Sequence, residues 1–313
     1  MNWNILPGKD RNVLRSALAE TDLVATSLRR IHGVDLGEGK PVVHAVEYVG
    51  EGGAMCVYRV WAGVGDQPPY SFALKMIKSR RLAAIFHRPV RNASALGEEE
   101  RVEDLINWVL EITKRVNRAA PEIYPLFGGY WRFRNDGGTL VRLLTEQFID
   151  GPTLLERRIE LENMMAAGEL DYAGYTARRV ALDRLTVAAF VRLWNALDRS
   201  VFTSDPSPWN VKVVTEGTSI RVVILDLHLL AEPAPPIFLI ERFQALYGLR
   251  AEIVRGAILP GIADVLGREE AATLFRELQP QLDELSAKSK ERVGTDLYSS
   301  VRRAIVDWFN SMS

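Results

Sequence analysis

The sequence has little of several features, and each shortage excludes a class of protein. Its 313 residues contain one cysteine, Cys56, so an internal disulfide is excluded and a reducing compartment is expected. An apolar stretch such as Ile220–Leu230 is interrupted by Arg221, Asp226 and His228. No run reaches the roughly 20 apolar residues that a membrane-spanning helix needs, and the first residues lack the apolar core of a secretory signal. We therefore expect a soluble, cytoplasmic protein.

The sequence also lacks an excess of basic or of acidic residues. The 39 basic and 40 acidic residues give a formal net charge of −1, which argues against broad electrostatic capture of nucleic acid. The four histidines are scattered without the spacing of metal ligands, which favours structural or surface roles. No internal repeat and no low-complexity segment is found. The oligomeric state and the partners other than a substrate stay open.

The first half of the chain has the patterns of a sheet with helices. An amphipathic helix is expected over residues 10–31, ending before Gly33. Alternating apolar runs then predict three strands, and Gly- and Asn-rich residues predict a hairpin that turns at Asn135–Gly138. The expected strands are 42–50, 55–63 and 70–77; a long helix is expected over 96–116, and the hairpin over 128–149.

After Gly151 and Pro152 the helical period dominates. Helices are expected over 153–166, 176–198 and most of 237–313, with a short strand pair in "VKVV" and "IRVVILD". The fold class expected is therefore α+β, bilobal, with a small sheet-rich N-lobe and a larger helical C-lobe. The expected divisions are a helical extension (1–40), the N-lobe (41–150) and the C-lobe (151–313).

Glycines cluster between the first two expected strands, in "GEGGAMCV". Gly50, Gly52 and Gly53 would let the backbone approach a phosphate, because glycine has no Cβ in the way. The alternative is an ordinary hairpin turn.

Lys75 lies in the apolar strand "FALKM". A lysine in a buried strand needs an anionic partner, whereas a lysine on an edge strand can point to solvent. Glu98, Glu99 and Glu103 of the following helix are the candidate partners, and Glu99 is favoured.

The loop "VFTSDPSPWNVKV" places Asp205 five residues before Asn210, and Asp226 ends a later strand. Carboxylate and amide oxygens suit Mg²⁺, and a further carboxylate can accept the proton of an attacking hydroxyl. The alternative is that these residues only form turns.

Taken in chain order, these pieces resemble the protein-kinase-like superfamily, from about Val46 to His228. The resemblance implies that Gly50, Gly52, Gly53 and Val57 form the phosphate loop and that Lys75 contacts ATP phosphates and pairs with Glu99. It implies adenine binding by backbone groups near Glu146 and Phe148. It also implies that Asp205 is the catalytic aspartate and that Asn210 and Asp226 hold magnesium.

Departures from the protein-kinase pattern narrow the resemblance. The H-R-D triplet reads Thr203-Ser204-Asp205, D-F-G reads Asp226-Leu227-His228, and no A-P-E motif follows. "SDPSPWNVKV" and "EQFIDGPTL" are more similar to the aminoglycoside and choline phosphotransferase-like branch. The implied activity is ATP- and Mg²⁺-dependent transfer of the γ-phosphoryl group to a hydroxyl acceptor, with a small molecule favoured. A divergent protein kinase, a pseudokinase and a nucleotidyl-transferring protein are the alternatives.

Overall fold

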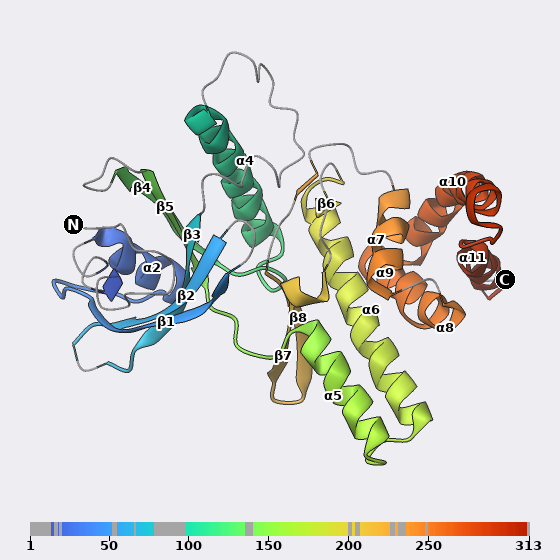
Figure 1. Cartoon of the computed structure of the whole chain (residues 1–313), viewed down its shortest axis with the longest axis horizontal. Coiled ribbons are helices and arrows are strands. Elements are labelled where there is room, and N and C mark those ends of the chain that lie inside the picture. Colours follow the sequence, from blue (N-terminus) through green and yellow to red (C-terminus); the bar gives the residue numbers. More distant parts are fainter. Residues whose placement is uncertain are drawn as a thin grey trace. The chain divides into compact units, whose positions relative to one another are not determined.

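The computed structural model describes residues 14–15, 18, 21–51, 55–65, 67–77, 98–134, 140–199, 202–203, 207–225, 229–230, 236–247 and 250–311. The chain divides into two compact units. Unit 1 runs to Pro121 and includes Pro125–Ile149, and unit 2 consists of Glu122–Tyr124 and Asp150–Ser313. Figure 1 traces both units along the chain. Among the described helices, none combines the length and the apolar character needed to cross a bilayer.

The centre of unit 1 is an antiparallel sheet with the strand order β1-β2-β3-β5-β4. β3 lies between β2 and β5, so both of its sides are paired. The strands expected from the alternating pattern are confirmed within one residue of their ends, and the turn expected at Asn135–Gly138 lies outside the described residues. The strands are β1 (Val42–Glu51), β2 (Met55–Gly63), β3 (Tyr70–Ile77), β4 (Phe127–Arg134) and β5 (Leu140–Gln147).

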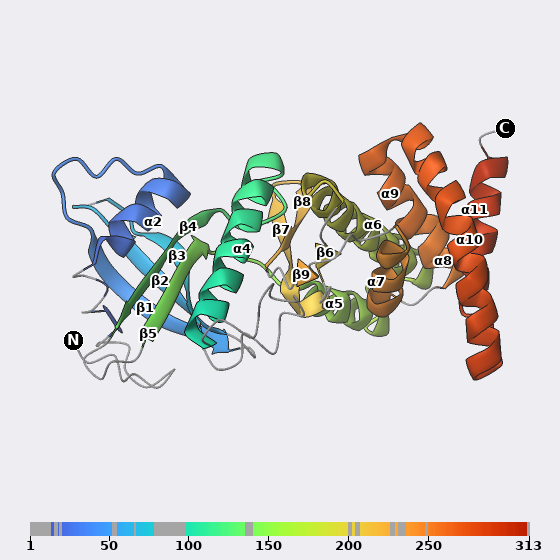
Figure 2. The same ribbon diagram turned by 90° about the horizontal axis from the view of Figure 1, so that it is seen from above.

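Helices cover the two faces of this sheet (Figure 2). Successive residues of a strand point to opposite faces. Cys56 and Tyr58 belong to the core beneath α2 (Asp22–His32), whereas Met55 and Ile77 pack with the apolar residues of α4 (Glu98–Ala119). The sheet therefore has an α2 face and an α4 face, and these two names are kept below.

The helix expected over 10–31 is not continuous in the described residues. Helical residues lie on both sides of Thr21, but Thr21 itself is extended, with φ −116° and ψ 151°. Its hydroxyl donates to the carbonyl of Leu18 at 3.0 Å. A β-branched residue favours an extended backbone, and two successive helices can share one apolar period.

The described residues before 40 pack into unit 1. Ser27 of α2 and Thr145 of β5 form a buried hydroxyl–hydroxyl hydrogen bond of 2.8 Å across the α2 face. Gly128 leaves room for this contact, since a Cβ there would lie 2.4 Å from the Thr145 Oγ1. Helix α2 is thus part of the same body as the sheet.

Unit 2 is mainly helical. Its helices include α5 (Leu154–Ala166), α6 (Tyr172–Ala196), α7 (Ile237–Tyr247), α8 (Ala251–Ile253), α9 (Leu259–Leu266), α10 (Arg268–Val293) and α11 (Ser299–Asn310), with a π-helical turn at Val254–Ile258. The strands β7 (Val211–Glu216) and β8 (Ser219–Ile224) form a hairpin, and β6 (Phe202–Thr203) pairs with β9 (Leu229–Leu230). The α+β class is confirmed.

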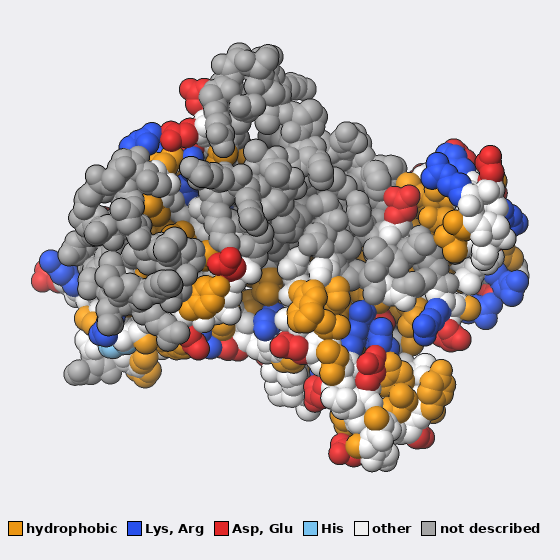
Figure 3. All heavy atoms as spheres, viewed as in Figure 1, with side chains coloured by type: hydrophobic (Ala, Val, Ile, Leu, Met, Phe, Trp, Pro, Cys, Tyr) orange, Lys and Arg blue, Asp and Glu red, His pale blue; other side chains and the backbone are white. Residues whose placement is uncertain are grey.

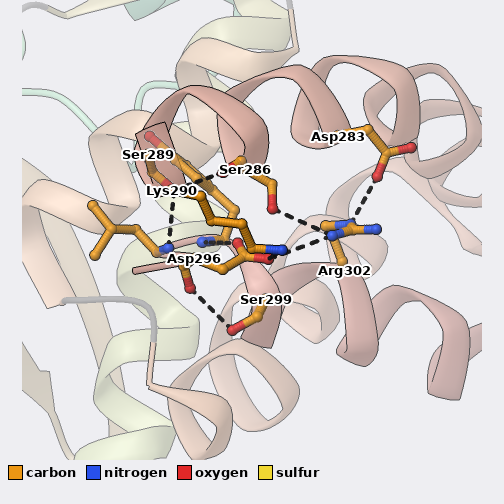
Figure 4. A network of polar contacts seen from close by, with 9 residues as sticks. Asp283, Ser286, Ser289, Lys290, Asp296, Ser299 and Arg302 are labelled. Atoms are coloured by element: carbon orange, nitrogen blue, oxygen red, sulfur yellow. Dashed lines mark hydrogen bonds and ion pairs between the residues drawn. The ribbon is translucent and has the colours of Figure 1, made fainter. Parts of the chain in front are cut away.

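A polar network joins α10 to α11 (Figure 4). Arg302 of α11 lies 2.8 Å from the Asp283 carboxylate, and Asp296 in the connecting loop lies 3.3 Å from the Lys290 ammonium. Hydrogen bonding from the Ser286 hydroxyl, with help from Lys290, lowers the pKa of Asp296. These contacts hold α10, the connecting loop and α11 together.

The surface of the described residues is mixed in charge. Figure 3 shows acidic, basic and hydrophobic side chains interspersed over the described part of this face. This agrees with the near balance of 39 basic and 40 acidic residues.

Candidate functional site

Lys75 occupies a central strand of unit 1. It lies opposite Val57 of β2 and opposite Leu144 of β5, so the edge-strand alternative is excluded. Leu144 and Ile77 belong to the apolar core of the α4 face, and Lys75 shares their side of the sheet. A charged side chain held on such a surface requires a compensating anion.

The compensating anion comes from the neighbouring strand. The Lys75 Nζ lies 2.5 Å from the Glu146 Oε2, with side-chain exposures of 13% and 4%. Lys75 is opposite Leu144 and Ala73 is opposite Glu146, so the two charged residues are diagonal neighbours on one face. The sheet register alone brings an ammonium and a carboxylate together.

The pairing of Lys75 with Glu99 is wrong. Glu99 is in the first turn of α4, where its exposed carboxylate lies 2.8 Å from Arg134 at the end of β4. Glu103, one turn later, pairs at 2.6 Å with the buried Arg142. The side chain of Glu98 lies outside the described residues. The sequence spacing from Val102 predicted which face of α4 carries Glu98 and Glu99. It could not predict which basic residue of the sheet each carboxylate would meet.

The glycine cluster belongs to the β1–β2 hairpin. Gly50 is in β1 opposite Val57, and Val57 is in turn opposite Lys75. The described strands therefore place Val57 beside Lys75, and Gly50 one strand further away. Gly52 and Gly53 lie outside the described residues, so their predicted contact with phosphates stays a prediction.

The expected adenine-binding residues lie at the end of β5. Glu146 is opposite Ala73 of β3 and Phe127 of β4, with a strand on each side. Phe148 follows β5, and its ring centroid lies 4.2 Å from the Arg59 guanidinium carbon. Binding of adenine by backbone groups here stays a prediction.

In unit 2, Asn210 ends a short 3-10 helix, η1 (Pro208–Asn210). Its amide donates to the Ser207 carbonyl at 2.9 Å, and its own carbonyl accepts from the Leu225 amide at 2.7 Å. Val211 is opposite Ile224 in the β7–β8 ladder, so Asn210 and Leu225 continue that ladder at one end of the hairpin. Asp205 and Asp226 lie outside the described residues, and Asp226 follows Leu225 directly in the sequence.

The hairpin that carries Asn210 is fixed on both strands. The Val213 amide donates to the Pro152 carbonyl at 2.9 Å, and the Ile224 amide donates to the Ile123 carbonyl at 2.8 Å. Gly151 lies so close that a Cβ would be 2.5 Å from the Val213 carbonyl oxygen, at a φ of 123°. Backbone contacts therefore fix the position of Asn210 at the start of this hairpin.

Helix α5 begins just after Gly151 and Pro152, which belong to the connector between β5 and α5. Thr153 and Glu156 form a capping box at the start of α5. Hydrogen bonds from the Thr153 backbone and hydroxyl lower the pKa of the Glu156 carboxyl. The capping box therefore gives the backbone amides of Thr153 and Glu156 their acceptors at the start of α5.

The donor chemistry at Asn210 fits a magnesium ion. An amide oxygen is a hard ligand, and a neighbouring carboxylate would complete the type of site that Mg²⁺ uses with phosphates. Within the described ranges, no group of three or more His, Cys, Asp or Glu side chains is placed to hold a metal. The expected site therefore depends on Asn210 together with a residue outside those ranges.

The sequence reasoning missed the side chain of Glu146 as a partner of Lys75. Glu146 was assigned only a backbone role, yet it lies in the strand "LVRLLTEQ", which is buried from Val141 to Glu146. A carboxylate in such a strand needs a cation as much as Lys75 needs an anion. The signal was present in the sequence, and the strand register was the missing information.

Comparisons with known proteins give distant likenesses. No protein-family model matches the chain, and no curated protein matches it at the level searched. Similar solved structures include WaaP in complex with acyl carrier protein, with a TM-score of 0.44, 11% identity, and coverage of 88% of this chain and 95% of that chain.

Two further solved structures are similar over part of their own length. Rad53 1-466 in complex with AMP-PNP has a TM-score of 0.37 and 18% identity, covering 58% of this chain and 38% of that chain. WbdD has a TM-score of 0.34 and 16% identity, covering 86% of this chain and 46% of that chain. All three TM-scores are below 0.5, so these likenesses do not indicate the function of this chain.

Proposed function

We propose that the chain is an ATP- and Mg²⁺-dependent phosphotransferase that moves the γ-phosphoryl group of ATP to a hydroxyl acceptor. The observation that carries the proposal is the Lys75–Glu146 ion pair on the α4 face, next to the glycine-containing β1–β2 hairpin. An ammonium in a largely buried position, on the strand next to this hairpin, is suited to binding phosphate oxygens.

In this proposal each residue has one task. Lys75 and the loop of Gly50, Gly52, Gly53 and Val57 orient the phosphates, while backbone groups near Glu146 and Phe148 bind the adenine. Asp205 positions the acceptor hydroxyl and accepts its proton. The hydroxyl oxygen then forms a bond to the γ-phosphorus as the bond to the bridging oxygen breaks, and ADP leaves.

Asn210 and Asp226 would hold the magnesium ion. The bound ion would neutralise phosphate charge, and the protein's part is to present two hard oxygen ligands. The Asn210–Leu225 backbone bond supports this assignment, because it ties the residue before Asp226 to Asn210 itself.

The proposed acceptor is a small molecule. In a peptide-directed kinase a long segment after the second aspartate forms a docking platform, whereas here α7 begins at Ile237, soon after β9 (Leu229–Leu230). The short connection leaves little chain for such a platform and favours a hydroxyl compound bound by the helical unit.

The test uses ATP labelled at either the γ or the α position, with Mg²⁺, the purified full chain and a metabolite extract. We expect the γ label, and not the α label, to appear in a small-molecule product. Asp205→Ala and Asp226→Ala should each lower the rate by a factor of about 100 or more. Glu111→Gln, an exposed residue of α4 paired with Lys114, is the matched control and should change the rate less than about twofold.

Each alternative has its own result in this assay. A chain that binds no nucleotide, or that turns none over with all components present, would overturn the enzyme proposal in favour of a pseudokinase. Transfer of the α label would indicate nucleotidyl transfer. Label found mainly on protein would indicate a divergent protein kinase.

A further inference from the structure

We infer that Glu146, a strand residue, is the positioning residue that orients Lys75, in the place that a glutamate of helix α4 would take. The inference rests on the proposed function, in which Lys75 contacts the phosphates. It gives the Glu146 side chain a role of its own, and it makes the orientation of Lys75 a property of the sheet.

The first support is the geometry of the pair. Lys75 and Glu146 come from adjacent strands, β3 and β5, whose register is fixed over five consecutive residue pairs. The two side chains extend over the same face, and their charged atoms are 2.5 Å apart. Because both Cα positions are held by one hydrogen-bonded ladder, their separation does not depend on where any helix lies.

The second support is that α4 is held to the sheet by a separate set of contacts. The Glu103 carboxylate lies 2.6 Å from Arg142 Nε and 3.2 Å from Arg132 Nη1. The Tyr130 hydroxyl donates to the same carboxylate at 3.1 Å. Burial, with the nearby Glu103 charge, raises the pKa of Tyr130, so the hydroxyl keeps the proton that it donates.

These contacts commit Glu99 and Glu103 of α4 to other partners. Glu103 is shared among two guanidinium groups and a hydroxyl, and the exposed Glu99 pairs with Arg134. Arg142 is only 1% exposed, so withdrawing Glu103 from it would leave a buried cation without its carboxylate. Movement of α4 toward Lys75 is therefore costly, and Glu146 serves Lys75 without it.

The pair also has an electrostatic role. A carboxylate within 4 Å of an ammonium favours the charged form of the lysine, which is the form that attracts phosphate oxygens. The carboxylate is 4% exposed, so water screens the attraction weakly. Loss of the Glu146 charge should therefore lower the pKa of Lys75 and free its ammonium to reorient.

The test measures the amine reactivity of Lys75 in the full chain without nucleotide. The protein is treated with a small amount of acetic anhydride at pH 8, and acetylation of Lys75 is followed by peptide mass spectrometry. Only a neutral amine reacts, so a lowered pKa appears as faster labelling. We expect Glu146→Gln to speed the labelling of Lys75 about tenfold or more. The labelling of Lys288 should not change, because its partner is Glu284.

Matched variants separate the strand from the helix. Glu98→Gln and Glu99→Gln remove two of the three α4 carboxylates that were the alternative partners, and each should leave Lys75 labelling within about twofold. Glu146→Asp keeps the charge but shortens the side chain, and it should give a smaller increase than Glu146→Gln. This variant keeps the test decisive if Glu146→Gln does not fold.

The outcomes distinguish this inference from the proposed function. Unchanged labelling in both Glu146 variants, or faster labelling in Glu98→Gln or Glu99→Gln, would overturn it whether or not the chain is an enzyme. If the wild-type chain binds no ATP, the proposed function fails while the labelling still reports on the pair. In an active enzyme, Glu146→Gln should raise the KM for ATP and lower kcat, and Glu146→Asp should restore part of both.

Discussion

The buried charges of this protein are residue-scale features with large energetic weight. Asp183 of α6 is fully buried, and its two oxygens accept from Arg158 at 2.8 Å and from Arg179 at 3.1 Å. The Arg158 guanidinium also lies over the Tyr247 ring, 4.8 Å from its centroid. Three helices of unit 2, α5, α6 and α7, thus meet at one carboxylate. Such a centre fixes positions more than it adds stability, and breaking it is costly.

Asp183→Asn should destabilise the protein strongly, by about 3–5 kcal/mol in the free energy of unfolding. The substitution keeps the shape of the side chain but removes the buried negative charge that faces both Arg158 and Arg179. Urea unfolding followed by circular dichroism measures the loss. The matched control is Asp264→Asn, which breaks the exposed Arg184–Asp264 pair and should cost about 0–1 kcal/mol. Equal losses for the two variants would show that burial does not set the cost.

At the scale of elements, the connector between β5 and α5 shows how backbone contacts hold the β7–β8 hairpin. Gly151 has a φ of 123°, and the Cβ of any other residue would lie 2.5 Å from the Val213 carbonyl oxygen of β7. The ammonium of Lys212 lies 2.6 Å from the Gly151 carbonyl. The close approach exists because residue 151 has no side chain, and it aligns β7 and hence Asn210 at its start.

Gly151→Ala should therefore cost about 3 kcal/mol, the sum of an unfavourable φ and a clash with backbone that cannot move aside. Gly168→Ala is the matched control. Gly168 also has a positive φ, 75°, but a Cβ there would meet nothing within 4 Å. It should cost about 1 kcal/mol, from the φ alone. Thermal unfolding of the two variants separates the terms, and a smaller loss for Gly151→Ala than for Gly168→Ala would contradict the clash.

At the scale of the whole molecule, the chain order and the compact units do not coincide. Glu122–Tyr124 belongs to unit 2 although it lies between two segments of unit 1. Ile123 and Tyr124 are buried, and the Ile123 carbonyl accepts from Ile224 at the end of β8. Unit 2 is therefore complete only when a piece of chain from before β4 is present.

A fragment of residues 150–313 should consequently be less stable than unit 2 in the full chain. Removing Ile123 and Tyr124 exposes apolar surface and leaves the Ile224 amide without its acceptor, at a cost of about 3 kcal/mol or more. Hydrogen exchange by mass spectrometry should show weaker protection of β8 in the fragment. The α10–α11 network contains no residue of 122–124 and should keep its protection. Equal protection of β8 in both samples would overturn the expectation.

The sequence by itself determined the elements and their chain order. Period-two runs placed β1, β2 and β3, and period-three-to-four runs placed α4 and α5, because a local pattern of apolar residues decides which face each element can bury. The expectation failed at Thr21, where one apolar period continues through two helices, since periodicity does not register a single extended residue. The roles proposed for Asp205, Gly52, Gly53 and Asp226 remain predictions from chain order.

The tertiary structure alone decided which charges meet. The apolar strand around Lys75 already indicated that this residue needs an anionic partner. The β3–β5 register decided which carboxylate it meets, and that carboxylate is Glu146. Glu99 and Glu103 were taken by Arg134 and Arg142, which are distant in sequence. Local patterns carry no information on register between strands that are 60 or more residues apart, because that register depends on the packing of both faces at once.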